Sequence, residues 1–246
     1  MLGSFLHSAL YYLVQGMVLG LFLFLFYKGN WKRLASVSAY LLALLLIDGV
    51  GRGYVLHYFG LNSIEYFYSY WLTDVALTLG AFLLVCTFFH RACAIQEEKM
   101  WRFIRLFLVF VFVLVLGISA FSLSRNYGNL FSKFMFEFQQ NLYFTCLVLN
   151  TLLYILMQQI ETADDELGML VCGMGLQFAG PAASFALKFL MPGSGFAESL
   201  MDFVMPLCTM GMLLTWFYAV SRMPKAVRIP ASKRLVPAMA ARRQVA

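Results

Sequence analysis

Charged residues are scarce in this sequence. Aspartate, glutamate, lysine and arginine make up 12% of its 246 residues, whereas hydrophobic residues make up 62%. Soluble domains carry about 25% charged and about 45–50% apolar residues. Together with a mean hydropathy of +0.78, this scarcity excludes an ordinary soluble domain and predicts an integral membrane protein.

Long polar segments are also lacking. The longest one is the C-terminal stretch 223–246. We therefore divide the chain into a transmembrane domain, 1–222, and a basic tail, 223–246, and expect no covalently attached kinase, cyclase or DNA-binding output domain. The net charge of +6 does not indicate nucleic acid, because the basic residues lie at the ends of apolar segments and in the tail, where membrane topology requires them.

Signatures of catalysis and of metal binding are missing. The five cysteines show no C-x-x-C spacing, and the three histidines fall on different apolar segments. No glycine-rich phosphate loop follows a strand, and no serine or cysteine pairs with a histidine at a matched depth. We therefore expect no metal, no cofactor and no catalytic residue, so that the protein is not an enzyme.

Long apolar runs take the place of these missing features. Each run approaches the ~20 residues that a helix needs to cross about 30 Å of hydrocarbon. The predicted spans are 5–27, 34–58, 66–89, 104–123, 138–160, 167–190 and 199–220. The sequence thus predicts an all-α integral membrane protein, a single bundle of seven transmembrane helices.

The distribution of basic residues predicts the orientation of the bundle. They concentrate in the first and third connections and in the tail: Lys28, Lys32, Arg33, Arg91, Lys99, Arg102 and Arg105, followed by seven between Arg222 and Arg243. The connections on the other side hold only Arg125 and Lys133. Because cytoplasmic loops carry the excess of lysine and arginine, we expect the N-terminus outside and the tail in the cytoplasm.

One connection on the cytoplasmic side departs from this pattern because it is acidic. Its residues 162–166 read Thr-Ala-Asp-Asp-Glu. We interpret them as a helix start, where carboxylates face the positive end of the helix dipole. Docking of a basic partner protein at this connection is the alternative.

Aromatic residues gather at the predicted ends of the spans. Tyr11 and Tyr12 are one such group, and a run that includes Tyr66, Tyr68 and Tyr70 is another. We interpret both as the belt of tyrosine and tryptophan that marks the membrane–water interface. The second run could alternatively form a wall of an outer pocket.

Asp48 and Arg52 are the most unusual feature of the second span. They lie four positions apart, which places them on one face of a helix, about 6 Å apart. Each charge alone inside a bilayer would cost several kcal/mol, so such residues pair with each other or line a polar cavity. Gly51 and Gly53 flank Arg52 and would permit close helix approach or local unwinding.

Further polar residues are predicted at a similar depth. Asp74, Lys188 and Asp202 lie on the third, sixth and seventh spans, and Gln139 enters the fifth span from the outer side. The predicted cluster is therefore Asp48, Arg52, Asp74, Lys188 and Asp202, in the outer half of the bundle. Pro181 and Pro206 interrupt the sixth and seventh spans and are, with Gly51 and Gly53, the predicted hinge positions.

Two interpretations of this cluster stay open. It is either a site for a ligand or an ion, or a structural ion network that fixes helix packing. In the structural case, Lys188 only extends toward the headgroups, and Asp202 only complements the dipole at the start of a helix.

Two functions fit this sequence. The first is a non-enzymatic sensor, receptor or accessory subunit of a membrane complex, which acts through protein partners in the membrane or at its cytoplasmic face. The second is a small proton- or cation-coupled transporter that uses the same carboxylates. In both cases we expect the chain to lie in a lipid bilayer, that of a bacterial inner (cytoplasmic) membrane, and to bind no nucleic acid.

Overall fold

A computed structural model shows how the predicted spans are arranged. It describes residues 2–60, 63–93, 98–123, 130–159, 164–190 and 195–222, without the side chains of 2–8, 98–100, 121–123, 130–133, 136, 188–189 and 195–202. Every regular element of the described residues is helical: α1 (Leu2–Lys28), α2 (Ala35–Leu44), η1 (Leu45–Gly51), α3 (Arg52–Phe59), α4 (Ile64–Cys93), α5 (Glu98–Leu123), α6 (Leu130–Gln159), α7 (Asp165–Leu190) and α8 (Gly195–Arg222).

Seven of the helices built from these described residues are long and apolar enough to cross a membrane. The prediction of an all-α chain with seven membrane-spanning helices is thus confirmed at this level. A helix suits the bilayer because it satisfies all its backbone hydrogen bonds within the segment. The observed spans agree with the predicted ones, with ends that differ by a few residues: Ala9–Lys28, Ala35–Phe59, Ile64–Cys93, Trp101–Ala120, Glu137–Gln159, Asp165–Leu187 and Phe203–Arg222.

Local sequence signals set several helix ends. Gly29 follows α1 and Gly60 follows α3, both with a positive φ of 73° and 74°, a conformation that glycine adopts without a steric penalty. Ser63 then precedes α4, where its Oγ accepts a hydrogen bond from the backbone N–H of Tyr66 at 3.0 Å. A hydroxyl at this position satisfies one of the free N–H groups of a helix start.

The second span is not a uniform α-helix. Its middle third, η1, is a π-helix that runs from Leu45 to Gly51, between α2 and α3. The backbone N–H of Arg52 accordingly bonds the carbonyl of Ile47, five residues back. The glycines predicted close helix approach or local unwinding here, and the structure has a continuous π-helical segment, which is wound less tightly than an α-helix. Such segments are rare and occur often at functional sites.

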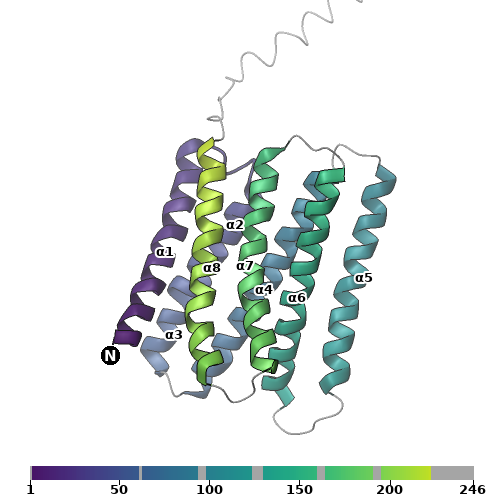
Figure 1. Cartoon of the computed structure of the whole chain (residues 1–246). Coiled ribbons are helices and arrows are strands. Elements are labelled where there is room, and N and C mark those ends of the chain that lie inside the picture. The colour runs from purple at the N-terminus through teal and green to yellow at the C-terminus, as the bar shows by residue number, and fades with distance from the viewer. Residues whose placement is uncertain are drawn as a thin grey trace, which may run out of the picture.

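The helices stand side by side in one bundle. In Figure 1, α1, α8, α7, α6 and α5 follow one another across the front, while α2, α3 and α4 lie behind them. Lys28, Arg33, Arg91 and Arg222 lie at one end, which we call the basic end. The N-terminus lies at the opposite end.

Ion pairs tie three segments together at the basic end. Glu166 on α7 contacts Arg33 of the connection after α1 at 2.7 Å and Arg91 on α4 at 2.9 Å. Arg91 also contacts Asp164 at 2.9 Å, and Asp164 Oδ1 accepts a hydrogen bond from the backbone N–H of Leu167. Asp164 therefore caps α7, as the helix-start interpretation of this acidic connection predicted.

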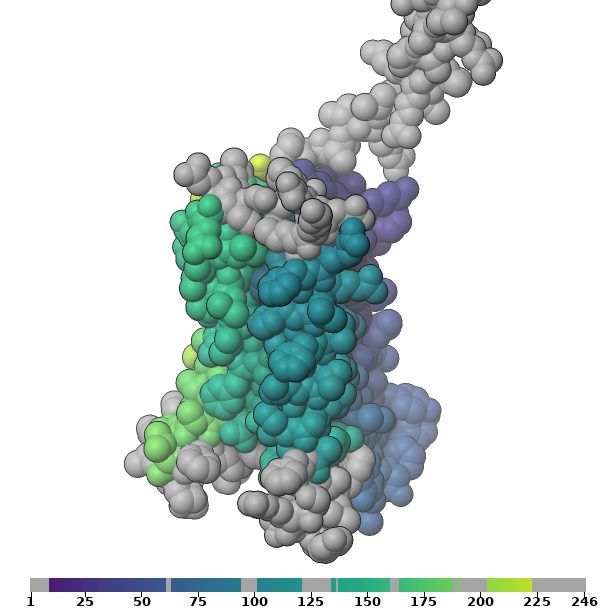
Figure 2. Space-filling view, turned by 90° about the vertical axis from the view of Figure 1, so that its right-hand side faces the viewer, coloured from purple at the N-terminus to yellow at the C-terminus, as the bar shows by residue number. Residues whose placement is uncertain are grey.

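The outside of the bundle is apolar. Figure 2 shows α5 covering the middle of one face, and its side chains Phe103, Leu106 and Phe110 are 71%, 70% and 61% exposed. Water would not tolerate such a continuous apolar face, whereas the hydrocarbon of a bilayer would. The composition of the exposed surface therefore agrees with membrane integration.

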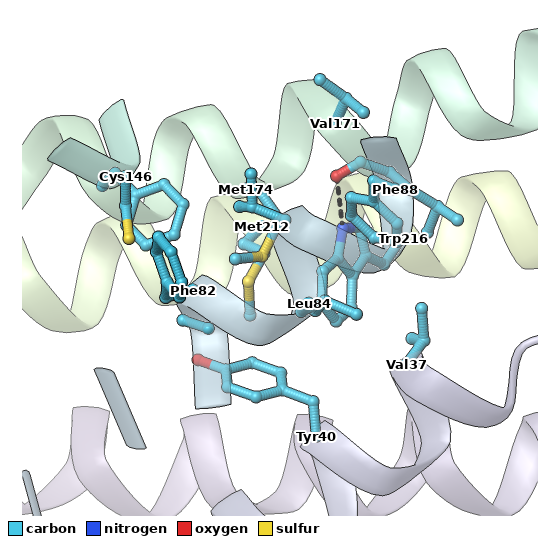
Figure 3. Packing of buried hydrophobic residues seen from close by; sticks show 14 of the residues in the cluster. Val37, Tyr40, Phe82, Leu84, Phe88, Cys146, Val171, Met174, Met212 and Trp216 are labelled. Atoms are coloured by element: carbon cyan, nitrogen blue, oxygen red, sulfur yellow. Dashed lines mark hydrogen bonds between the residues drawn. The ribbon is translucent and has the colours of Figure 1, made fainter. Parts of the chain in front are cut away.

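An apolar core runs through the bundle, and Figure 3 shows the part around Trp216, where side chains of α2, α4, α6, α7 and α8 pack together. Trp216 on α8 is fully buried, and its Nε1–H donates a hydrogen bond to the carbonyl of Leu170 on α7 at 3.0 Å. The ring of Tyr40 meets it edge-on, with 6.3 Å between ring centroids. Met174 and Met212 are fully buried in the same core.

Candidate intramembrane polar site

Arg52 stands at the centre of a polar cluster inside the spans. Its Nη1 lies 2.8 Å from Oδ1 of Asp48, and its Nη2 lies 2.9 Å from Oδ1 of Asp74. Its Nε–H donates to Oγ1 of Thr73 at 3.1 Å. One guanidinium thus bridges the carboxylates of two spans, which its planar fork of donors allows and a lysine would not.

Two amides complete the coordination of the carboxylates. Gln15 on α1 donates from Nε2 to Oδ2 of Asp48 at 2.6 Å, and Gln139 on α6 donates from Nε2 to Oδ2 of Asp74. Each carboxylate therefore has one oxygen on Arg52 and the other on a neutral amide. Side chains of four spans meet in this cluster, which we call the polar site: Gln15, Asp48, Arg52, Thr73, Asp74 and Gln139.

Tyrosines border the polar site. The ring of Tyr70 lies under the guanidinium of Arg52, 4.3 Å from its Cζ, an arrangement in which the face of the ring attracts the cation. The hydroxyl of Tyr11 donates to the backbone carbonyl of Asp48 at 2.8 Å. Tyr70 and Tyr11 therefore do more than mark the membrane interface, whereas Tyr12 is 73% exposed and fits the belt interpretation.

Two glycines of η1 leave the space that the site needs. A Cβ on Gly49 would lie 3.1 Å from Oε1 of Gln15, and a Cβ on Gly51 would lie 3.2 Å from the carbonyl oxygen of Leu46. The absence of a side chain at Gly49 therefore lets α1 come close to η1, and its absence at Gly51 leaves room for the backbone of the π-helical turn. A Cβ on Gly53 would meet nothing within 4 Å.

These distances give a prediction with an internal control. Gly49→Ala and Gly51→Ala are expected to destabilise the protein by about 1–3 kcal/mol, as overpacking does, because each added methyl displaces Gln15 or the π-helical turn. Gly53→Ala is expected to be neutral or to stabilise by up to about 1 kcal/mol, the difference in helix propensity. Unfolding in a detergent titration measures all three, and equal effects at Gly51 and Gly53 would contradict the role given to the π-helical turn.

The charges of the polar site are only partly shielded. The side chains of Arg52, Asp48 and Asp74 are 14%, 20% and 24% exposed in the isolated chain. Asp48 lies near the middle of its span, and Arg52 lies one turn nearer the end where α1 begins. In this arrangement either carboxylate can bind a proton, and the guanidinium of Arg52 can change the carboxylate with which it pairs. Among the described residues, no group of three or more His, Cys, Asp or Glu is placed to hold a metal ion.

The structure brings together three of the five residues predicted for the cluster. Asp48, Arg52 and Asp74 are in direct contact. Lys188 and Asp202 lie on α7 and α8, but their side chains are outside the described residues, and their part in the cluster stays a prediction.

The predicted hinge positions differ in their surroundings. Gly51 ends η1, and Gly53 lies in the first turn of α3. α7 and α8 run without a break through Pro181 and Pro206, so no interruption of the helix marks these two positions. Their role as hinges stays a prediction.

The sequence did not predict Gln15, Thr73 or the role of Tyr11 in the polar site. Gln15 is an amide within the otherwise apolar first span, which is a signal that could have been used. Thr73 directly precedes Asp74, and its hydroxyl also donates to backbone carbonyls of its own helix, so that sequence alone does not separate a helix-internal hydroxyl from a site residue.

Comparison of the chain with known protein families, curated proteins and solved structures finds no match.

Proposed function

We propose that the protein is a non-enzymatic sensor or accessory subunit of a membrane complex, in which the polar site is the sensing or regulated element. In this proposal the chain lies in a bacterial inner membrane with its N-terminus outside and its basic end, including the tail, in the cytoplasm. The excess of basic residues at one end supports this orientation. The polar site then belongs to the outer half of the bundle.

The carrying observation is that the described polar network is confined to one part of the bundle. Between the polar site and the basic end, the described core is dominated by buried apolar side chains around Trp216. Ser38, Thr78 and Asn150 are buried in this direction, and so is Oε1 of Gln177, but these scattered neutral groups do not form a hydrated route. A polar site that is closed by apolar side chains toward the basic end, and whose hydrogen bonds and ion pairs link four spans, is suited to control helix packing rather than to pass a solute.

The transporter is the second candidate, and one observation favours it. Two carboxylates share one guanidinium in the polar site, and intramembrane carboxylates are common in proton relays and coupled carriers. This function requires a polar route through the half near the basic end, and therefore a conformation in which the core around Trp216 separates.

One purification distinguishes the two candidates. The tagged protein is extracted from its source membrane in mild detergent, and co-eluting proteins are identified by mass spectrometry. We expect a defined partner at fixed stoichiometry, and an altered activity or amount of this partner with Asp48→Asn but not with Asp165→Asn, which neutralises an exposed carboxylate at the start of α7. A partner-free protein that drives pH-dependent flux in liposomes, abolished by Asp48→Asn, would instead establish the transporter.

A further inference from the structure

The charges of the polar site do not balance if every group is ionised. Asp48 and Asp74 contribute two negative charges, and Arg52 is the one cation that contacts them among the described side chains. Among the described residues, the titratable groups that face them from neighbouring elements include tyrosines, which are neutral at pH 7: Tyr11 on α1, Tyr40 on α2, Tyr70 on α4 and Tyr143 on α6. Counted over the described side chains, the ionised site would therefore carry one uncompensated negative charge within the membrane spans.

The ion pairs at the basic end show the contrast within the same chain. There, Arg33 and Arg91 face Asp164 and Glu166, so that two cations match two carboxylates. That network lies at the end of the helices, where water also reaches it. The polar site lies deeper, and its described side chains supply one cation for two carboxylates.

An uncompensated charge inside a bilayer is unfavourable, and two carboxylates that share one site avoid it by retaining a proton. We propose that the polar site is a proton-binding site, in which Asp48 and Asp74 share one exchangeable proton while Arg52 neutralises the remaining carboxylate. This inference rests on the proposed function, for which it identifies the ligand of the polar site as a proton.

The partners of the outer carboxylate oxygens fit this proposal. Gln15 and Gln139 are amides, and an amide holds a donor and an acceptor on the same end. Each can donate to a carboxylate, or turn and accept from the O–H of a carboxylic acid. An arginine or lysine in either position would have fixed the ionised form. The site therefore accommodates the proton on either aspartate without a change of helix positions.

The amide oxygen of Gln15 is such an acceptor. Its Nε2 serves Asp48, while its Oε1 is buried against Gly49 and accepts no hydrogen bond from the described residues. Rotation of the terminal amide exchanges these two atoms and presents the acceptor to Asp48. When Asp48 takes up the proton, rotation of this one side chain on α1 supplies the acceptor.

Infrared spectroscopy of the purified protein in nanodiscs tests the proposal. A protonated carboxyl group has a carbonyl-stretch band above the amide I band, which moves down in D₂O. At neutral pH we expect this band in the wild-type protein and its loss in both Asp48→Asn and Asp74→Asn, because either variant leaves one carboxylate for one guanidinium. Asp164→Asn, at the balanced basic end, is the matched control and is expected to keep the band.

Two results would overturn the proposal. If the wild-type protein lacks the band, both aspartates are ionised and the proposal is wrong. A change of the carboxylate bands on adding sodium or potassium would then identify a metal cation as the counter-charge. A band that survives in Asp48→Asn or in Asp74→Asn belongs to a carboxyl group that charge balance does not control. The infrared spectrum needs no partner protein, so it tests the proton site separately from the proposed function. The purification can find no partner while the band is present, and it can find a partner while the band is absent.

Discussion

Replacing Arg52 with glutamine is expected to lower the free energy of unfolding by about 3–5 kcal/mol, the usual loss when one partner of a buried ion pair is removed. The guanidinium contacts Asp48, Asp74 and Thr73 at once. Its loss leaves the acidic side chains of two different spans without a cation, in a place that is only partly exposed. The change is measured by unfolding in a detergent titration.

A neutral triple variant separates charge from packing in this prediction. Asp48→Asn, Arg52→Gln and Asp74→Asn together remove every charge of the network but keep side chains that form hydrogen bonds. We expect the triple variant to recover most of the stability that Arg52→Gln loses, because a neutral network has no unpaired charge. Arg222→Gln, an exposed cation at the end of α8, is the control and is expected to stay within about 0.5 kcal/mol. An Arg52→Gln variant as stable as the wild type would show that the network does not hold the helices together.

The spans could be predicted from sequence because the bilayer imposes a simple rule. A segment of about 20 apolar residues has to be helical to satisfy its backbone, and both the composition and the long runs of this chain meet that condition. The ends of the spans were predicted less accurately than their positions. α4 and α6, for example, continue through Ile64 and Leu130, where polar and aromatic residues lower the hydropathy without ending the helix.

The pair Asp48–Arg52 was predictable because helix geometry alone places residues four apart on one face. Asp74 was placed at the same depth by counting residues from the interface, and the structure shows it in contact with Arg52. The π-helical turn was not predictable in this form, because three glycines permit several local geometries. Gly49 of this segment faces Gln15 of another span, a tertiary contact that the local sequence does not contain.

The acidic connection before α7 shows a different limit of sequence analysis. Sequence gave two interpretations, a helix start and a docking site for a basic partner. Asp164 caps α7 by accepting a hydrogen bond from the backbone N–H of Leu167. The basic groups that face this connection belong to the chain itself, and they are Arg33 and Arg91. Which basic residues would meet an acidic loop depends on the order of helices around the bundle, and no local pattern contains that order.

The close packing of α7 against α8 leads to the second large effect. Trp216→Ala is expected to destabilise the protein by about 3–5 kcal/mol, because it empties the centre of the core near the basic end and removes the donor to Leu170. Gly173→Ala acts on the same contact from the other side. Its Cβ would lie 2.7 Å from the indole ring of Trp216 and 3.3 Å from the carbonyl of Met212, and overpacking of this kind costs about 1–3 kcal/mol.

The double variant makes the argument specific. If Gly173→Ala destabilises only because it collides with the indole, then the same change in the Trp216→Ala background is expected to cost almost nothing, a coupling of about 1–3 kcal/mol between contacting residues. Gly117→Ala, where a Cβ would meet nothing within 4 Å, is the matched control on α5. Additive effects of Gly173→Ala and Trp216→Ala would contradict the contact. Coupling would show that α7 and α8 pack against each other through Gly173 and Trp216.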